Sequence, residues 1–171
     1  MRHVALLRGI NVGGHRRVPM GELKATFERL GFADVRTYIQ SGNVVFGAAE
    51  PDRDTIEGAI QEDFGFPVDV MLRSADEWGT LAERNPYFTQ AAADGTKVHV
   101  AFLHGEPEPA RLDALRARDF GDDTWACVGR ELFLHTPHGL GRSSLSLDPL
   151  RQPATVRNWR TVEVIGGMLG E

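Results

Sequence analysis

Apolar and polar positions in the first seventy residues alternate between strand-like and helix-like spacing. Short apolar runs predict four strands, over His3–Arg8, Val35–Gln40, Val44–Phe46 and Val68–Leu72. Apolar residues at helical spacing predict one helix between Pro19 and Gly31 and another between Asp54 and Gly65, because glycine favours a left-handed helix end. The turn Ser41–Asn43 joins strands two and three as a hairpin. The resulting βαββαβ order is the ferredoxin-like arrangement, which the hairpin favours over a doubly wound parallel sheet.

The second half of the chain shows a looser version of the same order. Ser74 and Glu77 form a capping-box pattern at the start of a helix predicted to reach Arg84, and Thr155 is predicted to cap a last helix. Between them we expect a strand over Lys97–Leu103, a helix over Glu108–Arg118 and a hairpin over Thr124–Val128 and Glu131–His135. This βαββα order predicts an α+β protein of two closely packed ferredoxin-like halves, 1–73 and 74–171, with mainly antiparallel sheets. Element order alone supports an internal duplication.

Composition narrows the class of protein. The chain has 171 residues, 42% of them apolar and 25% charged, which suits a globular protein of one large or two small domains. No apolar run approaches the roughly 20 residues of a membrane span, and charges at Arg2 and Arg8 argue against a signal peptide. For lack of such a run, we expect no membrane partner. Cys127 is the only cysteine, so we expect a reducing, cytoplasmic location.

Charge is distributed unevenly along the chain. Residues 1–50 and 142–171 are net positive, whereas residues 51–141 carry seventeen acidic against eight basic residues. If the two ends meet, they form a positive patch; the alternative is ordinary solvated surface charge. The net charge of −5 argues against non-specific binding to duplex nucleic acid, which requires many phosphate contacts.

The loop Arg8–Gly14 follows the first strand directly and is the strongest candidate for a binding site. Its glycines allow close approach of a ligand, and successive N–H groups in such a loop can hold an anion. In the βαββαβ order this loop shares a sheet edge with Ser41–Asn43. We expect further contacts from the loop around Arg142 and from the first turn of the last helix. The candidate ligand-binding residues are Arg8, Gly9, Asn11, Gly13, Gly14, Arg17, Ser41, Gly42, Asn43, Arg142, Ser143, Arg157 and Asn158.

A structural interpretation competes with this one, because Asn and Ser commonly satisfy backbone groups of tight turns. The glycine loop lacks both the G-x-G-x-x-G spacing and the Gly-Lys-Ser/Thr of nucleotide-binding motifs. No metal site is predicted, since Thr136 and Pro137 separate His135 from His138 and exclude helical facing. The spacing indicates no catalytic set, so the cofactor is unknown and an enzymatic role is undecided.

Five segments together resemble the bacterial family catalogued as domain of unknown function 1697. They are Leu7–Gly14, Val18–Met20, Tyr38–Phe46, Gly141–Ser143 and Thr155–Val162. The resemblance extends over essentially the whole chain and implies a soluble α/β protein, without an activity to carry over. The family's glycine loop usually continues with lysine, where this chain has His15-Arg16-Arg17, and its Gly-Arg-Ser motif usually continues with lysine, where this chain has Ser144.

Three functions from different classes fit these observations. The first is binding of a small anionic or phosphorylated ligand at the glycine loops. The second is a single-stranded nucleic-acid module; it ranks lower because the strands Leu6–Leu7 and Val44–Phe46 lack an RNP-type pattern. The third is a homo-oligomeric interaction protein, and the oligomeric state is not predicted by the sequence.

Overall fold

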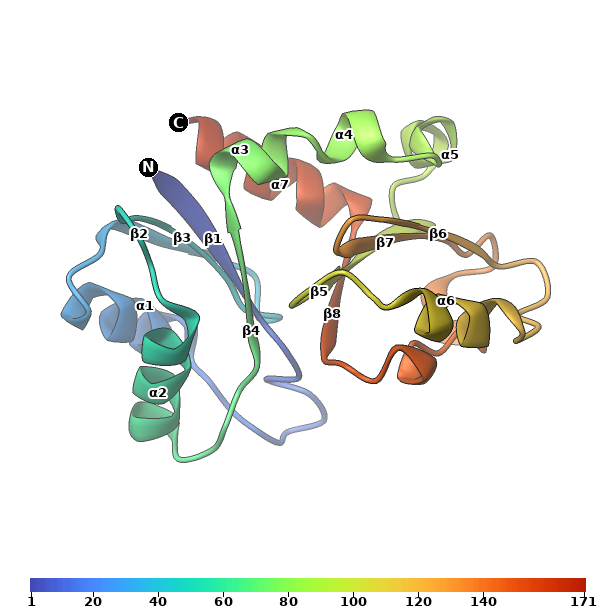
Figure 1. The fold of residues 1–171 in the computed structure, drawn as a ribbon. Coiled ribbons are helices and arrows are strands. Elements are labelled where there is room, and N and C mark those ends of the chain that lie inside the picture. Colours follow the sequence, from blue (N-terminus) through green and yellow to red (C-terminus); the bar gives the residue numbers. More distant parts are fainter. The chain divides into compact units, whose positions relative to one another are not determined.

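The computed structural model describes residues 1–171, which form two compact units. The first comprises Met1–Gly79 with Ile165–Glu171, and the second comprises Thr80–Val164. Each contains a four-stranded antiparallel sheet with helices (Figure 1), so the predicted α+β class and the antiparallel sheets are confirmed. The division of the chain into two domains, residues 1–73 and 74–171, stays a prediction. No helix is both long enough and apolar enough to cross a membrane.

The first sheet has the strand order β2-β3-β1-β4, and every neighbouring pair is antiparallel. Its strands are β1 (Arg2–Leu7), β2 (Ala33–Tyr38), β3 (Asn43–Gly47) and β4 (Val70–Ser74). Helices α1 (Met20–Arg29) and α2 (Arg53–Phe64) cover one face of this sheet (Figure 1). Side chains alternate along a strand, so Ala5 and Leu7 of β1 join the core beneath the helices.

Local chemistry sets the helix ends of the first unit. The carboxylate of Asp52 accepts the N–H of Thr55 at 3.0 Å and begins α2, two residues before the predicted Asp54. Gly31 and Gly65 have φ of +88° and +83°, as the prediction of left-handed helix ends requires.

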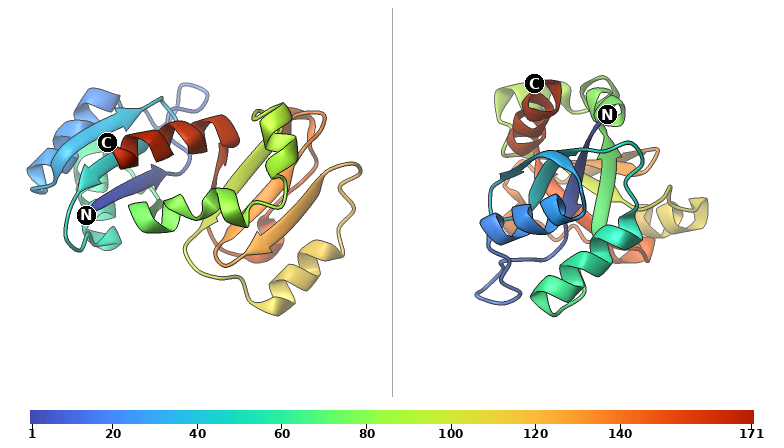
Figure 2. Two further views of the ribbon diagram at one scale, coloured as in Figure 1. Left: turned by 90° about the horizontal axis from the view of Figure 1, so that it is seen from above. Right: turned by 90° about the vertical axis from the view of Figure 1, so that its left-hand side faces the viewer.

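The C-terminal residues of the chain lie against the other face of the first sheet. Helix α7 (Trp159–Gly170) ends there, beside β1 (Figure 2). The guanidinium groups of Arg2 and Arg36 donate to the carbonyl of Met168 at 3.1 and 2.7 Å, and Arg36 also pairs with Glu171. Cations at a helix C-terminus satisfy its free carbonyls and complement its dipole, so these arginines hold the end of α7.

The second sheet has the order β6-β7-β5-β8 and is also antiparallel throughout. Its strands are β5 (Val98–Leu103), β6 (Thr124–Val128), β7 (Glu131–His135) and β8 (Ala154–Asn158). Helix α6 (Pro109–Arg116) and the 3-10 turn η2 (Asp148–Leu150) pack on one face, and Leu115 and Leu150 are buried in this core. The predicted hairpin around Gly129 has the bounds that the sequence indicated.

The segment between the sheets is more broken than predicted. The capping box is present, because the N–H of Ser74 donates to Glu77 Oε2 at 2.7 Å and the N–H of Glu77 to Ser74 Oγ at 3.1 Å. The single helix predicted over 74–84 is wrong: α3 (Ala75–Gly79) and α4 (Leu81–Arg84) are separate. A third helix, α5 (Phe88–Ala93), follows in a segment for which the sequence predicted no helix.

The prediction that Thr155 caps the last helix is wrong. Residues Ala154–Asn158 form β8 and pair with β5 along five positions. Thr155 and Arg157 are buried while their neighbours are half-buried, which is the alternation of a strand rather than a helix. The cap is Asn158, whose side-chain oxygen accepts the N–H of Thr161 at 3.0 Å. The second unit therefore has the fourth strand that the predicted βαββα order lacked.

A short repeated sequence occupies the same place in both sheets. The segment His3-Val4-Ala5-Leu6-Leu7-Arg8-Gly9 is matched by His99-Val100-Ala101-Phe102-Leu103-His104-Gly105, with five of the seven residues identical. Val4 lies opposite Arg73, and Val100 lies opposite Arg157, on the corresponding edge strand. Shared strand order, shared register and this sequence match together support an internal duplication, which element order alone suggested before.

Candidate functional site

Three loops meet at one edge of the first sheet. They are Arg8–Pro19 after β1, Ile39–Gly42 between β2 and β3, and Gly65–Asp69 before β4; together we call them the first-sheet rim. The N–H of Leu7 donates to the carbonyl of Gly42 at 2.9 Å, and the N–H of Arg8 to the carbonyl of Asp69 at 3.0 Å. The structure thus brings together the two loops that the sequence placed side by side, and adds a third.

Asn11 fastens the glycine loop to its surroundings. Its Nδ2 donates to the carbonyls of Val18 and Gln40 at 3.0 and 2.8 Å, and its Oδ1 accepts the N–H of Val18 at 2.8 Å. The residue has φ of +54°, a left-handed conformation that asparagine tolerates better than most residues. The side chain of Asn11 therefore shapes the rim.

The β2–β3 turn is likewise held by its own residues. Asn43 is fully buried and donates from Nδ2 to the carbonyl of Tyr38 at 2.8 Å and to Ser41 Oγ at 3.2 Å. Gly42 has φ of +90°, and a Cβ there would lie 2.7 Å from Cδ1 of Ile10. The positive φ favours glycine, and a Cβ would also lie only 3.0 Å from Cβ of Leu7, so the two loops approach closely here.

Arg16 is the most firmly placed cation of the rim. It was not among the candidate ligand-binding residues predicted from the sequence. Its Nε donates to the carbonyl of Gly9 at 2.9 Å, its guanidinium also donates to the carbonyl of Pro67, and it lies 4.8 Å from the ring centroid of Phe66. The residue stays exposed. Its place was deducible in principle: β4 neighbours β1 in the predicted order, so residues before β4 must meet residues after β1.

Two further arginines of the rim are exposed. Arg8 forms an ion pair with Asp69 at 3.3 Å, with side chains 52% and 39% exposed, and Arg17 lies on the surface beside Val18. Gly13 and Gly14 have φ of +60° and +77° in a tight turn closed by a bridge between Val12 and His15. A hollow of about 490 Å³ is lined by Arg8, Gly9, Arg16, Pro67 and Asp69. Two arginines therefore share one open hollow with a single carboxylate.

The remaining four candidates lie in the second unit, and none lines this hollow. Arg142 is exposed in the 3-10 turn η1 (Leu140–Arg142), and Ser143 Oγ donates to Asp123 Oδ2 at 2.5 Å. Arg157 is buried in β8 and donates to Thr155 Oγ1 at 2.7 Å; burial lowers its pKa to about 10. Because residues 154–158 form a strand, Arg157 is not in a helical first turn as predicted, and Asn158 caps α7.

Metal and thiol chemistry find little support in the structure. No group of three or more His, Cys, Asp or Glu side chains comes together in a way that could hold a metal ion. Burial raises the pKa of the Cys127 thiol, which disfavours the reactive thiolate.

Comparison with known proteins matches this picture of a defined fold without a defined reaction. The model of the family described as "Protein of unknown function (DUF1697)" matches residues 1–133. The chain belongs to this family. The match includes the glycine loop and the β2–β3 turn and ends within β7, so the segments around Arg142 and Arg157 lie beyond it.

A solved relative shows the same architecture. The conserved bacterial protein SP0830 from Streptococcus pneumoniae is 24% identical, with a TM-score of 0.73 over 99% of this chain and 98% of its own. At this identity the likeness establishes the fold alone. No curated protein matches the chain.

Proposed function

We propose that this protein binds a small anionic ligand, of the phosphate or phosphorylated-metabolite class, at the first-sheet rim. The observation that supports this most directly is Arg16, whose guanidinium is held by two carbonyls and stacked on Phe66 while remaining exposed. A guanidinium carries five N–H donors in a planar fork that suits phosphate and carboxylate. Fixing the fork before the ligand arrives lowers the entropy lost on binding.

The ion pair between Arg8 and Asp69 supports the same proposal. Exposed pairs of this kind stabilise a protein by only about 0–1 kcal/mol, so Arg8 can leave Asp69 for a stronger partner. A phosphate in the hollow has Arg8 and Arg16 on its walls and the exposed Arg17 on the same loop. The carboxylate of Asp69 disfavours anions, which makes the site selective for ligands that place a hydroxyl or amine near it.

The other candidate residues then take positioning roles. Asn11, Ser41, Gly42 and Asn43 hold two of the loops together, and Gly13 and Gly14 form the turn at the loop's tip. The proposal does not require Arg142, Ser143, Arg157 or Asn158.

The test is thermal denaturation in increasing inorganic phosphate and pyrophosphate, at constant ionic strength set with chloride. A ligand at ten times its Kd stabilises the folded state by about 1.4 kcal/mol, which raises the melting temperature measurably. We expect this rise in the wild type and in Arg116→Ala, an exposed arginine of the second unit. We expect none in Arg16→Ala, and a reduced rise in Arg8→Ala.

Two results would contradict the proposal. One is an unchanged melting temperature of the wild type in every phosphorylated compound tried. The other is an equal response in Arg16→Ala and Arg116→Ala, which would indicate a general salt effect. A short single-stranded oligonucleotide serves as a further probe: binding that grows steeply as salt falls, and survives Arg16→Ala, would favour the nucleic-acid alternative.

We further propose that both units are ferredoxin-like halves and that the protein is cytoplasmic. The two sheets share one strand order, in which the first strand lies between the third and the fourth. The single, half-buried Cys127 is consistent with a reducing compartment.

A further inference from the structure

Each four-stranded sheet leaves two edge strands, and three of the four carry a feature that discourages pairing with another chain. The pairing of β2 is irregular between Ala33 and Arg36, while β4 and β8 each contain a buried arginine, Arg73 and Arg157. Strand β6, with the sequence Thr-Trp-Ala-Cys-Val, has no charge, no proline and no irregularity. It is the one edge without such protection.

The direction of the backbone groups of β6 follows from its neighbour β7. The N–H of Leu103 in β5 donates to the carbonyl of Arg130 at 3.0 Å, so the even-numbered residues that follow in β7 also face β5. The odd-numbered residues of β7 then face β6 and bond there to residues 124, 126 and 128. The N–H and C=O groups of Trp125 and Cys127 consequently point toward the open edge.

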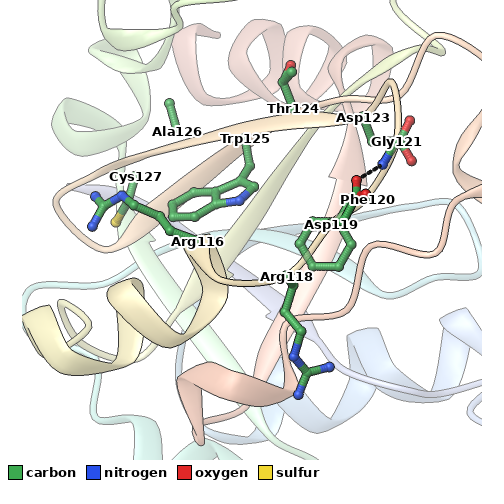
Figure 3. Close-up of a pocket in the computed structure, with 10 residues that line it drawn as sticks. All are labelled: Arg116, Arg118, Asp119, Phe120, Gly121, Asp123, Thr124, Trp125, Ala126 and Cys127. Atoms are coloured by element: carbon green, nitrogen blue, oxygen red, sulfur yellow. Dashed lines mark hydrogen bonds between the residues drawn. The ribbon is translucent and has the colours of Figure 1, made fainter.

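A hollow of about 600 Å³ lies beside this edge (Figure 3). Four successive residues of β6, Thr124–Cys127, line it together with Phe120 and the end of α6. The guanidinium of Arg116 lies 5.5 Å from the ring centroid of Trp125, so it covers the indole rather than the strand's backbone. Within the second unit, the outer edge of β6 is therefore left open.

We propose that β6 pairs with β6 of a second copy of this chain, antiparallel about a twofold axis at Ala126. The two second sheets then join into one sheet of eight strands. In this register Trp125 lies opposite Cys127 of the second copy, and their outward N–H and C=O groups bond to each other.

Side-chain size favours this register over its neighbours. It uses all five residues of β6 and sets the large Trp125 against the small Cys127. A shift of the axis to Trp125 or Cys127 sets two tryptophans or two cysteines opposite each other.

The first experiment measures mass in solution by sedimentation equilibrium. We expect the wild type to sediment at twice the chain mass of 18.9 kDa, and Cys127→Pro at 18.9 kDa. Proline at this position removes an outward N–H, while the bonds between β6 and β7 remain, as is usual for proline on an edge strand. Circular dichroism checks that the variant is folded.

The second experiment tests the register and does not depend on the proline variant. Across a non-hydrogen-bonded antiparallel pair the Cα atoms are about 4.5 Å apart, within the range that a disulfide spans. Ala126→Cys in a Cys127→Ser background should therefore form a covalent dimer under mild oxidation. Asp34→Cys in the same background, on the edge strand β2, is the control and should stay monomeric.

Two outcomes would overturn the proposal. A wild type that sediments as one chain across the whole accessible concentration range shows that β6 does not pair with itself. A dimer that survives Cys127→Pro, with no more cross-linking of Ala126→Cys than of Asp34→Cys, shows that the copies meet elsewhere.

Discussion

The two sheets share the backbone hydrogen bonds at one edge but differ in the loop that follows the first strand there. In the first sheet the N–H of Leu7 bonds to the carbonyl of Gly42, and in the second the N–H of Leu103 bonds to the carbonyl of Arg130 at the corresponding place. Twelve residues, 8–19, then separate β1 from α1, whereas five, 104–108, separate β5 from α6. The backbone scaffold is shared, and the difference lies in what the loop after the first strand contains.

The shorter loop of the second sheet is closed by a side chain. Gln152 donates from Nε2 to the carbonyl of Gly105 at 3.0 Å and accepts its N–H at 3.2 Å. The longer loop of the first sheet instead carries three arginines and borders a hollow. The comparison teaches that the repeated fold itself supplies neither the arginines nor the hollow; the extra loop residues on one copy do.

We expect the largest effect on stability from adding a Cβ at Gly42, where two loops of the rim approach closely. Gly42→Ala places a Cβ 2.7 Å from Cδ1 of Ile10 at φ of +90°, so strain and overpacking should destabilise the protein by about 3 kcal/mol. The matched control is Gly14→Ala, with φ of +77° but no atom near its Cβ, which should cost only about 1 kcal/mol. Urea denaturation measures both; equal losses would show that the close approach of the loops is unimportant.

The sequence predicted this contact more successfully than it predicted the site. The order βαββαβ was enough to place the glycine loop beside Ser41–Asn43, because topology decides which strand ends share an edge. It did not show that Asn11 and Asn43 would use their amides on backbone groups, since a free and a bonded asparagine have the same sequence signal. Arg16 was missed because its partners, Phe66 and Pro67, are fifty residues away.

At strand β8, by contrast, the local sequence pattern predicted the wrong secondary structure. Val156, Trp159 and Val162 have helical spacing, and a helix does include two of them. The preceding residues Ala154–Asn158 become a strand because β5 lacks a second neighbour without them. Tertiary pairing decides here, and local spacing cannot indicate it. The repeated segments beginning at His3 and His99 were the one signal in the sequence that pointed to this missing strand.

The next prediction compares Asn11 and Gln152, the side chains whose hydrogen bonds hold the loops after β1 and β5. Asn11→Ala leaves the buried N–H of Val18 without its acceptor and frees the loop from Gln40, so we expect a loss of about 2 kcal/mol. Gln152→Ala breaks two bonds that water can replace, for a loss of about 0.5–1 kcal/mol.

Amide hydrogen exchange should locate these changes. Faster exchange confined to residues 9–18 in Asn11→Ala, and to residues 104–108 in Gln152→Ala, would confirm that each side chain acts as a local tether. Loss of protection throughout the first sheet in Asn11→Ala would instead make this residue part of the core. Because Arg16 lies on the same loop, Asn11→Ala should also weaken the response to phosphate.

The smallest effect concerns the paired histidines of the repeat. His3 and His99 are both buried with Nδ1 unpartnered, and burial lowers the pKa of each below the usual 6.5. The unfolded chain therefore binds more protons below pH 6.5, so stability should be constant above that pH and fall as the pH drops beneath it. At His3 the backbone of Met1 and the charge of Glu77 oppose the effect of burial on the pKa, while the charge of the N-terminus adds to it. At His99 nothing opposes burial, and the charge of Lys97 adds to it.

We accordingly expect His99 to account for more of the acid sensitivity than its counterpart. Urea denaturation between pH 7 and pH 5 should show a slope that flattens in His99→Leu and changes less in His3→Leu. Both leucine variants keep an apolar side chain in a buried strand, so a general loss of packing would lower stability equally at all pH values. A slope that is the same in the wild type and in both leucine variants would mean that carboxylates, rather than the repeated histidines, set the acid limit of this fold.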